Sequence, residues 1–119
     1  MAIKQREVYF LPHPINPASV ENHPFIVLST QSSNEHERTF IGVMITSSIN
    51  KKDNFSFNLT DEMFEHPLKK SGSHVRMHLI TLCLNEEAIS RVNVMKEFYF
   101  KQLMKSIGDL IFDYDFSPL

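Results

Sequence analysis

Two histidines flank an arginine at alternate positions in the pattern His74-Val-Arg76-Met-His78. On a β-strand, alternate side chains share one face at a spacing of about 7 Å, so all three polar side chains could contact one phosphodiester. A guanidinium presents a rigid fork of donors to phosphate oxygens, and an imidazole can take and give a proton near neutral pH. The pattern therefore favours metal-free phosphodiester cleavage, although an ordinary exposed strand face can show the same alternation.

Other candidate residues stand at the ends of predicted strands. Thr46, Ser47 and Ser48 place three hydroxyl groups in succession, which could hydrogen-bond phosphate or ribose oxygens. The same residues are also typical of a turn. His23 precedes Pro24, which favours an extended backbone at the start of the second predicted strand.

Metal binding is not expected. The sequence has six histidines but only one cysteine, Cys83, and no His-x-x-x-His pattern stands on the predicted helix. On a strand, His74 and His78 would lie about 13 Å apart, too far to hold one ion together. We therefore expect no metal and no other cofactor.

Size and charge indicate one ordinary globular domain, residues 1–119. The chain has a mass of 13.9 kDa, and twelve basic against fourteen acidic residues give a formal charge of −2. The chain therefore has no overall positive electrostatic field that would attract nucleic acid or a membrane surface. Two lysine pairs, Lys51-Lys52 and Lys69-Lys70, could supply a local basic patch.

The single cysteine excludes an intrachain disulfide and is consistent with a cytoplasmic protein. The longest uncharged apolar run, residues 79–84, is far too short for a membrane span. The first six residues are polar, so the sequence predicts no signal peptide and no membrane partner.

Five strands precede one long helix in the predicted order of elements. The strand segments are residues 6–11, 25–29, 39–48, 55–60 and 73–84, and apolar residues recur at helical spacing over residues 94–112. Residues 30–37 and 85–92 are polar and predict turns, with one helical turn in the second. A compact, mainly antiparallel sheet, closed or nearly closed and with the helix at one side, is the expected fold.

Three details of this fold are specific enough to test. Gly42 predicts a bulge or a close backbone approach. Residues 12–22, with three prolines, predict a stiff loop that forms one wall of the site. In the fifth strand, Val75, Met77 and Leu79 should face the core, with His74, Arg76 and His78 on the opposite, solvent-reachable face.

Taken in order, these segments resemble the MazF/PemK toxins of type II toxin–antitoxin systems, also called the Kid or CcdB-like group. Residues 6–11 resemble R-G-[ED]-[IV]-[WY]-L without its glycine, and residues 23–29 resemble R-P-x-[LV]-[IV]-[LIV]-S with His23 in place of arginine. Residues 42–48 resemble the strand that ends in T-[ST], Phe57-Asn-Leu resembles the fourth strand, and residues 70–80 resemble K-x-S-x-V-x-[CL]-[DE]-Q-I-R.

This resemblance implies an SH3-like barrel of five to seven strands and a metal-independent, sequence-selective endoribonuclease that acts on single-stranded RNA. It implies a homodimer and a cognate antitoxin whose disordered acidic tail covers the site. Thr46 and Ser47 correspond to the family's hydroxyl pair, and Arg76 corresponds to its acid or phosphate stabiliser. His78 replaces an acidic residue and could act as general base, with His74 or His23 as the acid.

The departures at His23 and His78 leave a second hypothesis open. The chain could be a catalytically degenerate module that keeps the toxin fold and binds a protein or nucleic acid, as CcdB-like relatives bind DNA gyrase. A third class, an unrelated small enzyme, has little support because no G-x-S-x-G or phosphate-loop motif is present.

Overall fold

The computed structural model describes residues 2–12 and 21–116. Its elements in chain order are β1 (Glu7–Pro12), β2 (Asn22–Val27), α1 (Gln31–His36), β3 (Thr39–Thr46), the 3-10 turn η1 (Ile49–Lys51), β4 (Ser56–Asn58), η2 (Asp61–Met63), β5 (His74–Leu84), η3 (Asn85–Glu87), β6 (Arg91–Val94) and α2 (Glu97–Ile111). All five predicted strands and the long helix are therefore confirmed. The proline-rich loop cannot be compared, because residues 13–20 lie outside the described part of the chain.

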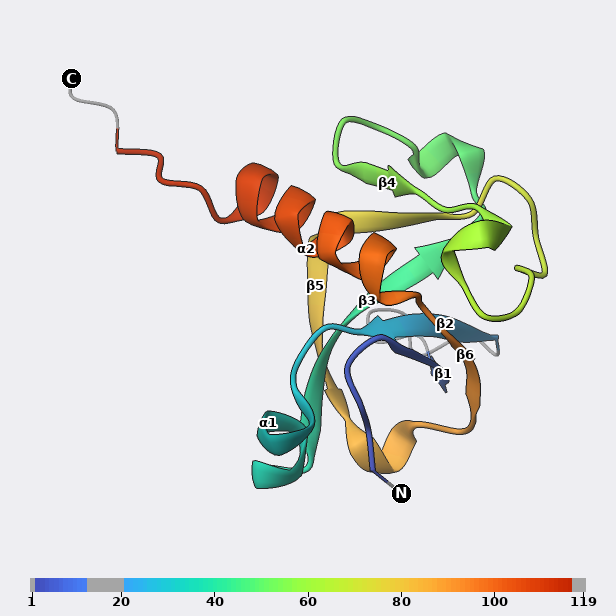
Figure 1. Cartoon of the computed structure of the whole chain (residues 1–119), viewed down its shortest axis with the longest axis vertical. Helices are drawn as coiled ribbons and strands as arrows, with labels where there is room; N and C mark the ends of the chain where they lie inside the picture. Colours follow the sequence, from blue (N-terminus) through green and yellow to red (C-terminus); the bar gives the residue numbers. More distant parts are fainter. Residues whose placement is uncertain (1, 13–20, 117–119) are drawn as a thin grey trace.

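The strands form one antiparallel sheet in the order β4-β5-β3-β2-β1-β6. The sheet curls into a half-barrel, and α2 crosses one of its faces (Figure 1). This arrangement confirms the predicted fold class. Among the described residues, no helix has the length and apolar character needed to cross a membrane.

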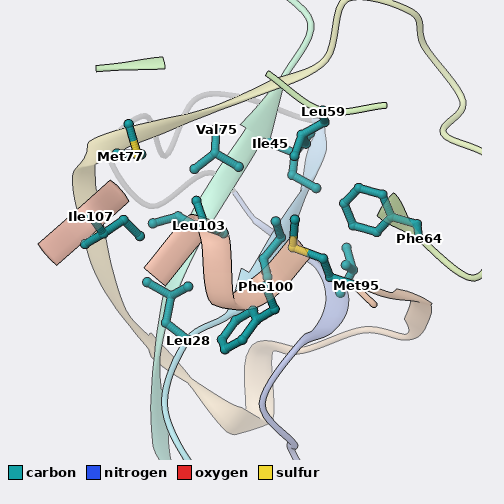
Figure 2. Close-up of a cluster of buried hydrophobic side chains, with 13 residues drawn as sticks. Leu28, Ile45, Leu59, Phe64, Val75, Met77, Met95, Phe100, Leu103 and Ile107 are labelled. Atoms are coloured by element: carbon teal, nitrogen blue, oxygen red, sulfur yellow. The ribbon is translucent and has the colours of Figure 1, made fainter. Parts of the chain in front are cut away.

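Both faces of the sheet are covered by apolar side chains. Figure 2 shows the larger cluster, in which Phe100, Leu103 and Ile107 of α2 pack against sheet residues that include Val75 and Met77. The spacing of the three helix residues puts them on one stripe of α2, which explains why the helix forms against the sheet. A second cluster on the other face contains Ile3, Tyr9, Leu11, Phe25, Val27, Phe40, Cys83 and Ala88.

A bulge in β5 changes which side chains face the core. Ile45 pairs with Val75, but Val43 pairs with Ile80, so β5 has three more residues than β3 over the same stretch. The predicted core positions Val75 and Met77 are confirmed as buried. Leu79 is only half-buried and belongs to neither cluster, and Ile80 packs against the larger cluster instead. The strict alternation predicted for the whole strand is therefore wrong beyond the bulge.

Gly42 lies at a close approach between strands, as predicted. A Cβ atom at this position would lie 3.2 Å from the carbonyl oxygen of Ile26 and 3.3 Å from the ring of Phe40. Gly42 pairs with Val27 of β2 and with Thr81 of β5, so its lack of a side chain allows the central strands to pack tightly.

Two elements differ from the sequence prediction. Residues 31–36 form a helix rather than a turn, because the Asn34 side chain is buried and its amide donates to the carbonyl of Ile3 at 2.8 Å. Residues 91–94, which span the end of the predicted turn (85–92) and the start of the predicted helix (94–112), form β6 and pair with β1 through Glu7↔Val94. Both elements depend on contacts distant in sequence.

The buried carboxylate of Glu7 links strand β1 to strand β6. Glu7 of β1 accepts a hydrogen bond from the Tyr9 hydroxyl at 2.9 Å and pairs with Arg91 of β6 at 3.2 Å. Burial, and then the hydrogen bond to Glu7, raises the pKa of Tyr9 to about 12. This network holds the outer strand β6 against β1.

Candidate functional site

Strand pairing brings the predicted residues of β3 and β5 together. Thr46 pairs directly with His74, and His74 pairs on its other side with Asn58 of β4. Side chains of directly opposed residues in antiparallel strands lie on the same face. Thr46 and His74 are therefore neighbours on the face opposite Val75, and Arg76 follows two residues along β5 on that face.

Arg76 and His78 contact each other along β5. Nη2 of Arg76 lies 3.4 Å from Nε2 of His78, and the Phe55 ring packs at 5.4 Å from the imidazole, centroid to centroid. A guanidinium can only donate hydrogen bonds, so Nε2 is the acceptor in this contact and the proton of a neutral His78 resides on Nδ1. The imidazole thus presents its basic nitrogen to the arginine.

Three buried nitrogens along this strand have no hydrogen-bond partner. They are Nε2 of His74, Nε of Arg76 and Nδ1 of His78. Leaving a buried polar group unpaired is costly, so such groups commonly meet water or a ligand. Arg76 and His78 are half-buried, so their nitrogens are the ones that could meet the oxygens of an anion such as a phosphodiester.

His74 itself is not solvent-reachable, which corrects the prediction. The side chain is fully buried, and its Nδ1 lies 3.4 Å from the carbonyl oxygen of Gly72. β3 and β4 flank β5 at this position, so Thr46 and Asn58 lie on either side of the imidazole. Arg76 and His78 are half-buried, which leaves part of each side chain open to solvent.

A cleft of about 430 Å³ lies at the end of β3. Its lining includes Thr46, Ser47 and Ser48, together with His23 and Pro24 from β2. Phe25 pairs with Met44, and the same register continued by two residues places His23 beside Thr46. The structure thus gathers the hydroxyl residues and His23 at the cleft, whereas Arg76 and His78 lie farther along β5 and do not line it.

Two lysines and an aromatic ring of the cleft were not predicted as site residues. Lys69 and Lys70 also line the cleft, and Nζ of Lys69 lies 5.3 Å from the centroid of the Phe10 ring. A flat aromatic face beside cations suits a nucleobase with its phosphates. The sequence predicted that the lysine pair could form a basic patch, but it did not predict that the Phe10 ring lies beneath Lys69.

No metal centre is evident within the described ranges, where no group of three or more His, Cys, Asp or Glu side chains could hold an ion. The charged groups at the site are mainly basic, although Glu21 also lines the cleft. Arg76 stands on β5, and Lys69 and Lys70 stand at the cleft. An anionic ligand therefore fits the local charge better than the formal charge of the whole chain suggests.

Several solved structures have the same fold. A MazE–MazF complex from Deinococcus radiodurans superposes with a TM-score of 0.74 at 15% identity, over 96% of this chain and 100% of that one. An endoribonuclease in complex with its cognate antitoxin from a Mycobacterial species gives 0.68 at 11% identity, over 91% of each chain. A MazF toxin from Mycobacterium tuberculosis gives 0.67 at 14% identity, over 93% and 100%.

At these identities the structural matches establish the fold, and the family follows from the sequence itself. No curated protein sequence matches the chain significantly. The profile of the family described as "PemK-like, MazF-like toxin of type II toxin-antitoxin system" matches residues 4–110, which is nearly the whole chain. The protein is therefore a member of the PemK-like, MazF-like toxin family of type II toxin–antitoxin systems.

Proposed function

We propose that this toxin is a metal-independent endoribonuclease that cleaves single-stranded RNA. The observation that carries the proposal is the contact between Arg76 and His78, 3.4 Å apart, on the sheet face that also holds Thr46. A fixed cation beside an imidazole supplies a group that stabilises the phosphate and a general base for phosphodiester cleavage through a 2′-hydroxyl.

The proposed reaction begins when an RNA phosphate accepts hydrogen bonds from the Arg76 guanidinium. Nε2 of His78 is then released from its contact with Nη2 and takes the proton of the 2′-hydroxyl. The 2′-oxygen bonds to phosphorus, the bond from phosphorus to the 5′-oxygen breaks, and the products are a 2′,3′-cyclic phosphate and a 5′-hydroxyl end. Arg76 stabilises the negative charge that develops on the phosphate oxygens.

The leaving 5′-oxygen needs a proton, and His23 is the better candidate donor. His74 is fully buried, whereas His23 is half-buried and lines the cleft beside Thr46. We assign His74 a positioning role between Thr46 and Asn58. The hydroxyls of Thr46, Ser47 and Ser48 would hold phosphate or ribose oxygens along the cleft.

The cleft would carry the RNA strand beside the reacting phosphate. Lys69 and Lys70 would pair with backbone phosphates, and Phe10 would stack on a base. The same basic surface suits an antitoxin with an acidic, extended segment, which would block the site by occupying the RNA path. As the family resemblance implies, we further propose that the toxin acts as a homodimer.

A second candidate function is binding without turnover. His78 stands where the family motif has an acidic residue, and His23 stands where it has arginine. A module of this kind would bind a protein or nucleic acid tightly, and substitution of His78 by asparagine would leave that binding unchanged. An enzyme would lose turnover in the same variant.

Induced expression in a bacterium tests the proposal. Wild-type protein should arrest growth and fragment cellular RNA, and Arg76→Ala should do neither at equal protein level. Arg38→Ala is the matched control, because Arg38 is exposed at the opposite end of β3. Growth arrest without RNA fragments in the wild type would favour the binding module.

A further inference from the structure

β5 has an open edge over its second half. β4 pairs with β5 only from His74 to Arg76, and the last bond on that side runs from the Met77 amide to the Phe55 carbonyl at 2.9 Å. From His78 to Leu84, β3 is the only strand paired with β5 among the described residues. The other side of this stretch presents unpaired backbone groups.

The register identifies which backbone groups face outward. Ile41 directs its carbonyl to the Leu28 amide at 2.8 Å and its amide to the Ser29 hydroxyl at 2.8 Å, both on the β2 side. Ile41 therefore lies opposite Leu82 without exchanging backbone hydrogen bonds with it. The amide and carbonyl of Leu82 consequently point away from β3. The same holds for Ile80 and Leu84, two residues on either side. An open edge of this kind is a template for another strand.

Exposed apolar side chains accompany this edge. Leu82 is 70% exposed and lies beside Ile41, and Leu84 is also exposed. A groove of about 500 Å³ runs between Ile41 and Leu82 on one side and α1 residues on the other. We call Ile41, Leu82 and Leu84 the β5 shelf. Native proteins usually protect such an edge with charge, proline or a covering element.

The segment after α2 has the pattern of a strand without a partner. Phe112, Tyr114 and Phe116 are 67%, 84% and 84% exposed and alternate with Asp113 and Asp115. This period of two puts three aromatic rings on one side of an extended chain and two carboxylates on the other. Figure 1 shows the segment leaving α2 in a direction away from the sheet.

We propose that residues 112–116 of one copy add as a strand to the open edge of β5 in a second copy, with the three aromatic side chains on the β5 shelf. The outward groups of Leu82 and its neighbours would complete their hydrogen bonds with the added backbone.

The size of the contact is sufficient for a dimer. Each aromatic side chain buries about 150–250 Å², so two reciprocal segments with three rings each would cover roughly 1,000 Å², the scale of a specific interface. A second copy is favoured over the chain's own β5, because the segment points away from its own sheet. This contact does not depend on the proposed RNA chemistry.

Disulfide trapping between two separately prepared variants tests the proposal directly. In a Cys83→Ser background, which removes the native thiol, one preparation carries Leu82→Cys and the other Tyr114→Cys. Mixing them under mild oxidation should give a covalent heterodimer, with Phe112→Cys and Phe116→Cys as alternatives for the register. Ile89→Cys, at another exposed apolar residue, is the control and should give at least tenfold less product.

Three outcomes of the trapping would overturn the proposal. One is a yield no higher than that of the control. The second is a stronger cross-link between two Leu82→Cys chains, which would mean that β5 pairs with β5. The third is an intramolecular disulfide in the Leu82→Cys/Tyr114→Cys double variant, which would mean that the segment folds back on its own chain.

Sedimentation equilibrium gives an independent test without RNA. Self-association should weaken at least tenfold in a chain that ends at Ile111 and in the full-length Phe112→Ser/Tyr114→Ser/Phe116→Ser variant, which guards against misfolding of the shorter chain. Leu82→Lys should have the same effect, because a charge would stand on the shelf. Ile49→Lys, at an exposed isoleucine outside the shelf, should leave association unchanged. Equal association in all of these variants would contradict the proposal.

Discussion

Nη2 of Arg76 lies 3.4 Å from Nε2 of His78, so the strand that carries both residues already joins a fixed cation to a basic nitrogen. In the family motif that this segment resembles, the second position is acidic. An imidazole can replace a carboxylate as general base, but unlike a carboxylate it becomes a cation when it takes up the proton. Arg76 would then repel it unless a phosphate lies between them.

The first prediction concerns the general base. His78→Asn should reduce the rate of RNA cleavage by about 100-fold or more, because an amide cannot accept the proton of the 2′-hydroxyl. His36→Asn, at an exposed histidine on α1, should leave the rate unchanged. A cleavage rate in His78→Asn equal to that of the wild type would exclude His78 as the base.

The second prediction concerns the cleft lysines. The slope of log Kd for single-stranded RNA against log salt should become shallower by about 1.4 in Lys69→Ala/Lys70→Ala, since each lost phosphate contact contributes about 0.7. The double variant Lys101→Ala/Lys105→Ala removes the same charge from α2, where both lysines are exposed, and should not change the slope. Equal slopes in the two variants would place the RNA elsewhere.

The third prediction concerns backbone strain at Arg38. This residue follows the C-terminus of α1 and has φ 56°, a left-handed conformation that glycine adopts more readily. Arg38→Gly should raise the free energy of unfolding by about 0.5–1 kcal/mol in urea denaturation. Arg38→Ala keeps the Cβ atom and should change stability little, so equal effects of the two substitutions would argue against strain.

The fourth prediction concerns alkaline stability. Burial raises the pKa of Cys83 to about 12 from 9.0, and burial with a hydrogen bond to Glu7 raises the pKa of Tyr9 to about 12 from 10.0. The unfolded chain releases these protons at lower pH than the folded chain, so the free energy of unfolding should fall as the pH rises from about 9 towards 12.

Variants of the two tyrosines test this alkaline loss. Tyr9→Phe should lower stability at neutral pH, because the hydrogen bond to Glu7 is lost, and should make the decline above pH 10 shallower. Tyr114→Phe, at an exposed tyrosine, should change neither. Urea denaturation between pH 7 and 11 gives the comparison, and an unchanged decline in Tyr9→Phe would assign the loss to other groups.

Local patterns predicted most of the sheet but not where regular pairing breaks. Strand formers and period-2 alternation marked β1 to β5, and Val75 and Met77 face the core as expected. The bulge in β5 carries no glycine or proline that would mark it, so the faces of Leu79 and Ile80 could not be inferred. α1 and β6 depend on distant partners, Ile3 and Glu7, and local propensity cannot reveal these.

The missing glycine in the first motif has a structural explanation. Arg6, directly before Glu7, has φ 78°, the conformation that favours glycine. The backbone at Arg6 therefore has a conformation that a glycine would adopt readily, and the Arg6 side chain donates to the Met95 carbonyl at 3.1 Å. A sequence motif alone could show the absence but not this conformation.

The parts of the candidate site that lie on paired strands could be predicted from the sequence. The parts that depend on loops could not. Pairing of β3 with β5 makes Thr46 and His74 neighbours, which follows from strand order. The burial of His74 depends on β4 as a third strand, and the contact of Lys69 with Phe10 depends on the path of a loop. Neither is encoded in local spacing.

Cleavage of a purified RNA oligonucleotide in the presence of EDTA tests the central claim most directly. Wild-type protein should cut a long unstructured RNA and leave 2′,3′-cyclic phosphate ends, and a 2′-deoxy nucleotide at the cleaved position should abolish the cut. Arg76→Ala should lower the rate by at least about 100-fold, with Arg38→Ala as the matched control. Absence of cleavage by the wild type, or an equal rate in Arg76→Ala, would contradict the account.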